Sequence, residues 1–280
     1  MSDFRTHTQE FHMTLTARSL FKPRLRGIAV ATAMAAVSVG ASAALSPFTL
    51  NPAGAGLSGT SFTADNVLIS DFSTVTFGAG GTFTDSGYLS VSAFQLGGIT
   101  STPAGLNSSY GLYIKFDGAG TQTAVNPALT PAFGSFSSLT YTLYGYNGPA
   151  SFGFSGNTPT TTAPAGVALA SGSLNYGSVS SVPTGDGTTF TPSANANLSF
   201  NVAAGQNAFF AAPSPFFNLA LTAFTNTTSE VEAFDGGFRI RQGGGSFNFT
   251  STPAVPEPQT YAMLLGGLAA VGFVARRRRT

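Results

Sequence analysis

The sequence predicts an all-β fold, a single antiparallel β-sandwich of roughly eight to twelve strands with jelly-roll-like connections. Three observations predict it. Apolar residues alternate with Ser, Thr and Asn over several runs, which is the pattern of half-buried antiparallel strands. Asn-Gly and Asp-Gly pairs, which favour tight hairpin turns, stand between such runs. Between residues 44 and 254, no run shows the period of an amphipathic helix, and no fixed repeat indicates a solenoid or propeller.

The clearest predicted strand lies at residues 197–202, where Leu198, Phe200 and Val202 would share one face of a sheet. Shorter stretches of the same alternation and longer apolar-rich runs complete the set of predicted strands. They lie at 67–77, 88–96, 110–116, 138–143, 167–182, 216–224, 238–241 and 246–249.

Turn residues separate these strands. Asn147-Gly148 and Asp235-Gly236 are each expected to close a hairpin between the flanking runs, because both pairs tolerate positive φ values. Asp117-Gly118 and the Gly-Asp-Gly sequence at 185–187 mark further reversals of the chain. The segment 158–166, rich in threonine and proline, is expected to be a loop.

The composition excludes several kinds of active site. The chain has no Cys and no Trp, and its two histidines, His7 and His12, lie near the amino terminus. The chain after residue 43 therefore has no thiolate nucleophile, imidazole base, disulfide or His/Cys metal site. We expect no catalytic residue, no cofactor and no metal. The 26 Phe residues argue against disorder, because disordered segments are poor in aromatic side chains.

Charge is sparse and mildly acidic in the central part of the chain. Residues 44–254 contain three basic residues against eight acidic ones, a net charge of about −5, although the whole chain carries +1. The other basic residues stand in the two terminal segments. Since nucleic-acid binding needs a basic surface, no nucleic-acid partner is expected.

The amino-terminal segment has the layout of a secretory signal peptide. Basic residues precede the apolar stretch 28–39. Ala41 and Ala43 then place small side chains at the two positions that signal peptidase reads, which predicts cleavage between Ala43 and Ala44. Residues 1–43 are therefore expected to be removed during export.

The carboxyl-terminal segment has three parts in order. Pro256-Glu257-Pro258 holds the backbone extended, since proline fixes φ and removes a hydrogen-bond donor. The apolar run 261–275 follows, and as a helix it would reach only about 23 Å, short of the roughly 30 Å hydrocarbon core of a bilayer. The run ends at four arginines, which would stay on the cytoplasmic side: Arg276, Arg277, Arg278 and Arg279. The pattern predicts a short transmembrane helix.

This tail resembles the PEP-CTERM sorting signal, with Pro256-Glu257-Pro258 as the matching tripeptide and the four arginines as the basic end. In that family an exosortase in the inner membrane recognises the signal and releases or re-attaches the passenger. Such enzymes are typical of Gram-negative bacteria that make exopolysaccharide, biofilm or floc. The resemblance implies processing by an exosortase, transient membrane contact through the helix, and a final location at the cell surface or in the extracellular matrix. An ordinary tail anchor is the alternative.

These features divide the chain into three segments. A signal peptide occupies residues 1–43, with translation beginning at Met1 or Met13, and a β-sandwich passenger domain occupies 44–254. The sorting signal, with its tripeptide, helix and arginine cluster, occupies 255–280. Signal peptidase and an exosortase are the expected processing partners.

The passenger itself has Phe- and Gly-rich segments that look like parts of flocculation-associated PEP-CTERM proteins. These segments are 48–52, 62–66, 215–219 and 238–247. Members of that group are implicated in aggregating cells within an exopolysaccharide matrix, and the resemblance brings no catalytic residue. It implies a non-enzymatic surface or matrix protein that acts in cell aggregation, flocculation or biofilm formation. Because few charges guard the predicted edge strands, self-association by edge pairing is a further expectation.

An enzymatic alternative rests on three acidic residues. Glu230, Glu232 and Asp235 lie close enough in sequence to resemble the paired carboxylates of a glycosidase. A secreted polysaccharide-active hydrolase, or a carbohydrate-binding module, is therefore the alternative function. A solvated strand edge or hairpin mouth explains the same residues without catalysis.

Other polar residues allow weaker hypotheses. Asp117, Asp186 and Asp235 each precede a glycine and have oxygen atoms that suit Ca²⁺, although aspartate before glycine is also a common turn residue. Tyr144 or Tyr146, if exposed, would stack on sugar rings. None of these patterns decides between the functions.

Overall fold

The computed structural model describes residues 45–124 and 126–251. These residues form sixteen strands and three short 3₁₀ helices. In chain order they are β1 (Phe48–Leu50), η1 (Pro52–Ala55), β2 (Phe62–Ala64), β3 (Asn66–Phe77), η2 (Ala79–Gly81), β4 (Thr82–Leu96), β5 (Ile99–Ser101), β6 (Tyr110–Gln122), β7 (Ala132–Asn147), β8 (Phe152–Ser155), β9 (Thr158–Thr161), β10 (Val167–Pro183), β11 (Phe190–Ser199), β12 (Asn201–Val202), β13 (Phe210–Ala212), β14 (Leu219–Thr225), η3 (Thr228–Glu230), β15 (Val231–Phe234) and β16 (Gly237–Thr250). Within these two ranges, no helix is long and apolar enough to cross a membrane.

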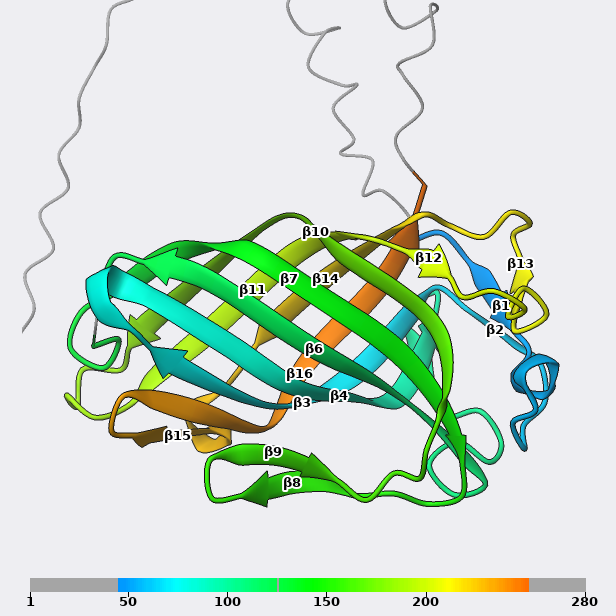
Figure 1. Cartoon of the computed structure of the whole chain (residues 1–280), viewed down its shortest axis with the longest axis horizontal. Helices are drawn as coiled ribbons and strands as arrows, with labels where there is room; N and C mark the ends of the chain where they lie inside the picture. Colours follow the sequence, from blue (N-terminus) through cyan, green and yellow to red (C-terminus); the bar gives the residue numbers. More distant parts are fainter. Residues whose placement is uncertain (1–44, 125, 252–280) are drawn as a thin grey trace, which may run out of the picture. The chain divides into compact units, whose positions relative to one another are not determined.

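Eight of the strands close into one barrel (Figure 1). Around the barrel the order is β3, β4, β6, β7, β10, β11, β14 and β16, and every neighbouring pair is antiparallel. The last strand returns to the first, because β16 pairs with β3 from Gly237 opposite Thr76 to Phe247 opposite Val67. Since each barrel strand pairs with the next one along the chain, this is an up-and-down barrel.

The all-β prediction is confirmed, but the predicted sandwich with jelly-roll-like connections is wrong. A jelly roll brings strands that are distant in the chain side by side, whereas only the closing pair of this barrel does so. Alternation has the same appearance in both folds, because a strand in either has one inner and one outer face. The pattern therefore predicted a strand at each barrel position without indicating that the sheet closes. Closure leaves the barrel without free edges, so the expected edge pairing between copies has no site on its eight strands.

Glycines on the inner face allow large rings to pack inside the barrel. A side chain on Gly120 of β6 would place its Cβ atom 2.5 Å from Phe83 of β4, so the Phe83 ring occupies that space. Tyr141 of β7 lies over Gly172 of β10 in the same way, at 2.6 Å from the position of a Cβ atom. A ring on one strand thus fills the gap that the neighbouring strand leaves, and glycines also permit the bending that a closed sheet needs.

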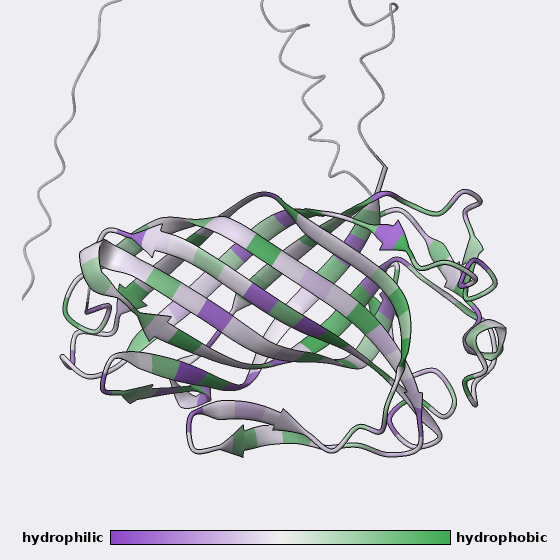
Figure 2. Ribbon diagram, in the orientation of Figure 1, coloured by the Kyte–Doolittle hydropathy of each residue, from purple (hydrophilic) through white to green (hydrophobic). Residues whose placement is uncertain are grey.

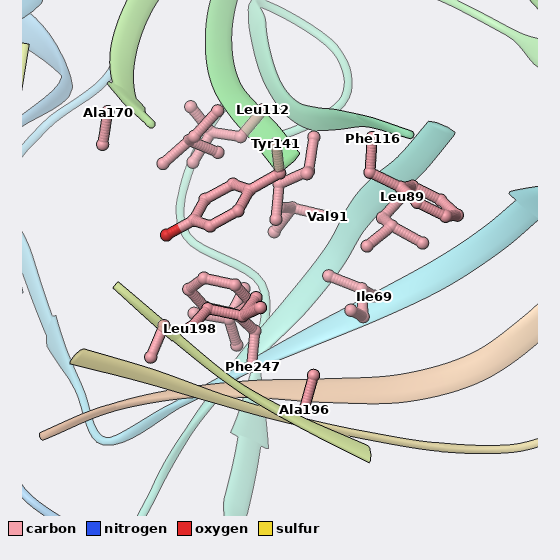
Figure 3. Packing of buried hydrophobic residues seen from close by; sticks show 14 of the residues in the cluster. Ile69, Leu89, Val91, Leu112, Phe116, Tyr141, Ala170, Ala196, Leu198 and Phe247 are labelled. Atoms are coloured by element: carbon pink, nitrogen blue, oxygen red, sulfur yellow. The ribbon is translucent and has the colours of Figure 1, made fainter. Parts of the chain in front are cut away.

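Apolar side chains from all sides fill the barrel interior. Figure 2 shows hydrophobic and hydrophilic residues alternating along the barrel strands. Figure 3 shows the inward side chains converging, with Tyr141 from β7 facing Phe247 from β16, and their ring centroids are 5.9 Å apart. A three-stranded sheet of β13, β1 and β2 lies beyond one end of the barrel (Figure 1). Its Phe48 ring packs against Phe249, near the end of β16, at a centroid distance of 4.9 Å.

The structure confirms two of the four predicted turns. Asp235-Gly236 does close a hairpin, between β15 and β16, and residues 185–187 lie in the connection between the paired strands β10 and β11. Asn147-Gly148 does not, because β8 pairs with β9 and not with β7. Asp117-Gly118 lies inside the continuous strand β6, where Phe116 and Gly118 extend the inner face. The segment expected to be a loop, 158–166, begins with strand β9.

Candidate functional site

The residues expected to be read by the processing enzymes lie outside the described residues. They are Ala41, Ala43 and Ala44 at the predicted signal-peptide cleavage, and Pro256, Glu257, Pro258, Arg276, Arg277, Arg278 and Arg279 in the tail. The predicted signal peptide and transmembrane helix also fall there. The described part of the chain contains two other features with chemical potential, a cavity inside the barrel and a polar strip on its outer surface.

The cavity has a volume of about 90 Å³ and lies inside the barrel. It is nearer the start of β16, at Phe238 and Ile240, whereas the β13–β1–β2 sheet packs near the end of that strand. Most of its wall is apolar, with Phe116 and Phe136 among the lining rings. The interior of an eight-stranded barrel is just wide enough for side chains to fill or for one small ligand.

Two carboxyl groups, of Asp71 in β3 and Asp85 in β4, line this cavity. The strand register places Ser73 opposite Gly87 and Val75 opposite Asp85, so Asp71, Ser73 and Asp85 share the inner face. Asp71 is only 5 % exposed and Ser73 is fully buried. The Oδ1 atoms of both aspartates have no hydrogen-bond partner in the described part of the chain.

Burial controls the protonation of this carboxyl pair. Loss of hydration raises the pKa of Asp71 well above its usual value, and the nearby charge of Asp85 raises it further. Burial also raises the pKa of Asp85, from 3.8 to about 7. Hydrogen bonding to the adjacent Ser73 hydroxyl lowers the pKa of both carboxyl groups, but this effect is smaller than the increase caused by burial.

The pair has no basic partner inside the barrel. The described residues include three basic side chains, those of Lys115, Arg239 and Arg241. Lys115 is exposed, opposite Tyr88 on the outer face, and both arginines form ion pairs with Glu232. A buried carboxylate without a counter-charge is strongly destabilising, so the site favours either a bound proton or a positively charged ligand.

Other buried polar side chains line the same cavity, among them Asn226 and Ser181. Asn226, which follows β14 and is 2 % exposed, has its Oδ1 atom directly over Gly243 of β16. A Cβ atom on Gly243 would lie only 2.0 Å from that oxygen. Gly243 of β16 pairs with Asp71 of β3, so the Asn226 Oδ1 atom lies next to Asp71 on the neighbouring strand. Ser181 of β10 is also buried, and neither its hydroxyl nor the Asn226 oxygen has a described hydrogen-bond partner.

Sequence reasoning did not single out these cavity residues, although part of the signal was present. Asp71 stands in phase with Val67, Ile69 and Val75 along one alternating strand. Asp85 stands in the same way between Phe83 and Leu89. An acidic residue in the apolar phase of a strand predicts a buried carboxyl group.

The acidic cluster considered for catalysis is engaged in structural contacts. Glu230 accepts a hydrogen bond from the Thr227 amide at 2.6 Å and closes the capping box of η3. Glu232 accepts from Arg239 and pairs with Arg241 at 3.0 Å, and the Arg239 hydrogen bond lowers the pKa of Glu232. Asp235 lies in the turn between β15 and β16. Two of the three carboxylates therefore already have partners.

The three aspartates considered for Ca²⁺ occupy separate elements. Asp186 forms a turn, because its Oδ1 accepts from the amides of Thr188 at 2.8 Å and Thr189 at 2.7 Å. The Thr189 hydroxyl donates to the other oxygen, and these bonds lower the pKa of Asp186. Asp117 is exposed in mid-strand, and Asp235 is in the hairpin turn described above. Across residues 45–124 and 126–251, no group of three or more His, Cys, Asp or Glu side chains is placed to hold a metal ion.

The tyrosines considered for sugar binding are largely covered. Tyr146 is 3 % exposed, and Tyr144 is half-buried and stacked on Tyr113, with ring centroids 5.1 Å apart. A different ring, that of Tyr176 in β10, is 67 % exposed. Sequence reasoning did not select it.

Tyr176 stands beside a strip of uncharged polar side chains on the outer face, where β10 meets β11. We call this strip the β10–β11 ladder. Hydrogen bonds join its members across the two strands: Ser173 with Ser199 at 3.3 Å, Asn175 with Asn197 at 2.8 Å, Ser178 with Asn195 at 3.1 Å, and Ser180 with Ser193 at 2.7 Å. The ladder presents hydroxyl and amide groups without any ionisable side chain.

Comparison with known proteins identifies the tail of the chain. The family model of the PEP-CTERM protein-sorting motif matches residues 254–279, a range that includes the Pro-Glu-Pro tripeptide and the four arginines. No curated protein and no solved structure matches the chain. The motif indicates a protein that is exported and sorted by an exosortase to the cell surface or the extracellular space.

Proposed function

We propose that the barrel is a non-enzymatic surface or matrix protein that binds exopolysaccharide and thereby contributes to cell aggregation, flocculation or biofilm formation. The sorting motif supports the extracellular location. The single observation that carries the binding role is the β10–β11 ladder with the exposed ring of Tyr176 beside it.

The chemistry of this strip suits a neutral or weakly acidic glycan. Sugar hydroxyl groups both donate and accept hydrogen bonds, as do the Ser and Asn side chains of the ladder. The apolar face of a sugar ring packs on an aromatic ring such as that of Tyr176. Individual contacts of this kind are weak, but a polymer that presents many sugar units and many protein copies gains strength through multivalency.

The alternative function, a polysaccharide hydrolase, has less support. In the acidic cluster, Glu230 and Glu232 are engaged by Thr227, Arg239 and Arg241. The other acidic pair lies in the cavity of about 90 Å³, which is small beside the roughly 300–1,000 Å³ of typical ligand pockets. We therefore propose binding without catalysis.

A direct test is co-sedimentation of the purified full chain with exopolysaccharide from the organism that makes it. Tyr176→Ala should weaken binding by about two- to tenfold, the value of one aromatic contact. Ile99→Ala is the matched control, because Ile99 is another exposed apolar residue, 75 % exposed, on strand β5. Equal binding by wild type and Tyr176→Ala would contradict the proposed binding face. Unchanged floc formation after gene deletion, with the exosortase intact, would contradict the cellular role.

A further inference from the structure

We propose that the cavity inside the barrel is a binding site for a hard metal cation of the Ca²⁺ class. The carboxylates of Asp71 and Asp85 and the amide oxygen of Asn226 would be its protein ligands. This inference concerns the barrel interior and does not depend on the proposed matrix role.

The geometry brings these oxygens to one wall of the cavity. On β4, Gly87 lies between Asp85 and Leu89 and has no side chain. The Ser73 side chain of β3 occupies the space beside it, since a Cβ atom on Gly87 would lie only 2.7 Å from the Ser73 Cβ. Asp71 and Asp85 therefore flank Ser73 on adjacent strands. On the other side of β3, Gly243 also lacks a side chain, and the Asn226 oxygen takes that place beside Asp71. Two glycines thus leave room for an oxygen cluster in an otherwise apolar interior.

The unpartnered atoms specify the charge of the ligand. The fully buried atoms of Asp71, Asp85 and Asn226 that have no described partner are acceptor oxygens. Asn226 is nearly fully buried, so its oxygen is an observation separate from the acidic pair. Once both carboxyl groups are ionised, they favour a positively charged partner, and the basic side chains of the described residues lie outside the barrel.

Oxygen ligands of this mixed kind favour Ca²⁺. Calcium accepts carboxylate, amide and water oxygens in a flexible shell of about six to eight, whereas Mg²⁺ demands near-ideal octahedral geometry. The cavity of about 90 Å³ leaves space for waters to complete the shell, since one water needs only about 10–15 Å³ by this measure. With two carboxylates, we expect a dissociation constant on the order of 10⁻⁴–10⁻³ M, the range of extracellular calcium modules.

The test uses the purified full chain refolded separately in CaCl₂ and in EGTA at pH 8. The thermal midpoint, followed by circular dichroism, should be higher in calcium. Asp71→Asn and Asp85→Asn should each lose this increase, while Asp117→Asn, which changes an exposed carboxylate on β6, should keep it. Asparagine has nearly the same size as aspartate and removes a buried charge, so both variants are expected to fold in EGTA.

A second measurement locates the ion. Tyr141 lines the cavity, so excitation of tyrosine should sensitise luminescence of Tb³⁺ used in place of calcium. Wild type and Asp117→Asn should show Tb³⁺ emission that Ca²⁺ displaces, and Asp85→Asn should not. The proposal is overturned if calcium leaves the wild-type midpoint unchanged, or if the increase survives in both cavity variants. Emission that persists in Asp85→Asn would place the ion elsewhere and would equally overturn it.

Discussion

Asp71 and Asp85 flank Ser73 on neighbouring strands inside the barrel, and no basic side chain of the described residues accompanies them. Most of the interior around them is apolar, with Val75, Leu89 and Phe116 among the residues that line the cavity. A fold maintained by packing alone would replace such a pair with apolar residues, because unpaired buried carboxylates reduce stability. Their presence in an otherwise apolar cavity therefore connects the stability of the barrel to the proton or cation that they bind.

The first prediction concerns pH. The pKa of Asp85 is about 7 in the folded state, against a usual value of 3.8. As pH rises from about 4 to 7, the unfolded chain loses this proton while the folded chain retains it, so the free energy of unfolding should fall. The fall should be on the order of 4 kcal/mol and should level off above pH 7. Asp71, whose pKa is also raised, acts in the same direction.

Urea unfolding measured in EGTA between pH 4 and 8 checks this expectation. Asp85→Asn should reduce the pH dependence, because the variant has no proton to lose at that position and only the contribution of Asp71 remains. Asp117→Asn should keep the wild-type slope, since Asp117 is exposed on the outer face. Parallel profiles for wild type and Asp85→Asn would show that Asp85 does not control stability.

The second prediction concerns the glycines beneath interior rings. In Gly172→Ala, the new Cβ would lie 1.8 Å from the Ser199 carbonyl oxygen and 2.6 Å from the Tyr141 ring. Since the new Cβ would meet backbone atoms of Ser199, and Gly172 itself pairs with Tyr141 of β7, relief requires movement of backbone, and we expect a loss of about 1–3 kcal/mol in unfolding free energy. Gly153→Ala on β8 is the control, because nothing lies within 4 Å of its new Cβ. Similar urea midpoints for the two variants would argue against close packing at Gly172.

The third prediction concerns the β8–β9 hairpin, which lies along the outside of the barrel (Figure 1). Arg239 of β16 donates hydrogen bonds to the Gly156 carbonyl and, at 3.3 Å, to the Asn157 side chain in the hairpin turn. Its guanidinium also lies 5.7 Å from the centre of the Phe154 ring. Arg239→Met should therefore loosen the hairpin while leaving the barrel folded.

Hydrogen exchange resolved by residue measures this loosening. Amide exchange across 152–161 should accelerate about fivefold, with little change in the barrel strands. Lys115→Met removes an exposed charge elsewhere and should leave hairpin exchange as in wild type. Uniform acceleration throughout the barrel would instead assign Arg239 a role in global stability.

The sequence predicts the strands well because each strand follows a local period of two residues. Closure could not be predicted in this way, since it depends on β16 pairing with β3, two strands at opposite ends of the described chain. Tyr176 shows the same limit at a single residue. Strict alternation from Leu174 would direct Tyr176 inward, but a register shift between these two residues turns its ring to the outer face.

Only part of the candidate cavity site could be predicted from the local sequence pattern. The carboxyl groups of Asp71 and Asp85 stand in the apolar phase of their strands, so their burial follows from local pattern. Asn226 follows the end of β14, outside any alternating run, and reaches the cavity because Gly243 on another strand leaves space for it. That relationship depends on tertiary structure, which no local pattern contains.

The last prediction concerns the fate of the tail. Because residues 254–279 match the sorting motif, mass spectrometry of the surface-derived protein should find an amino terminus at Ala44 and a carboxyl terminus without Arg276–Arg279. Glu257→Ala should impair recognition by the exosortase and leave the chain in the membrane fraction with its arginines intact. Glu232→Gln, a change in the barrel portion, should leave this processing unaffected. Recovery of wild-type chain from the surface with all four arginines would mean that the motif is not cleaved, and retention of the helix would then make it a permanent anchor.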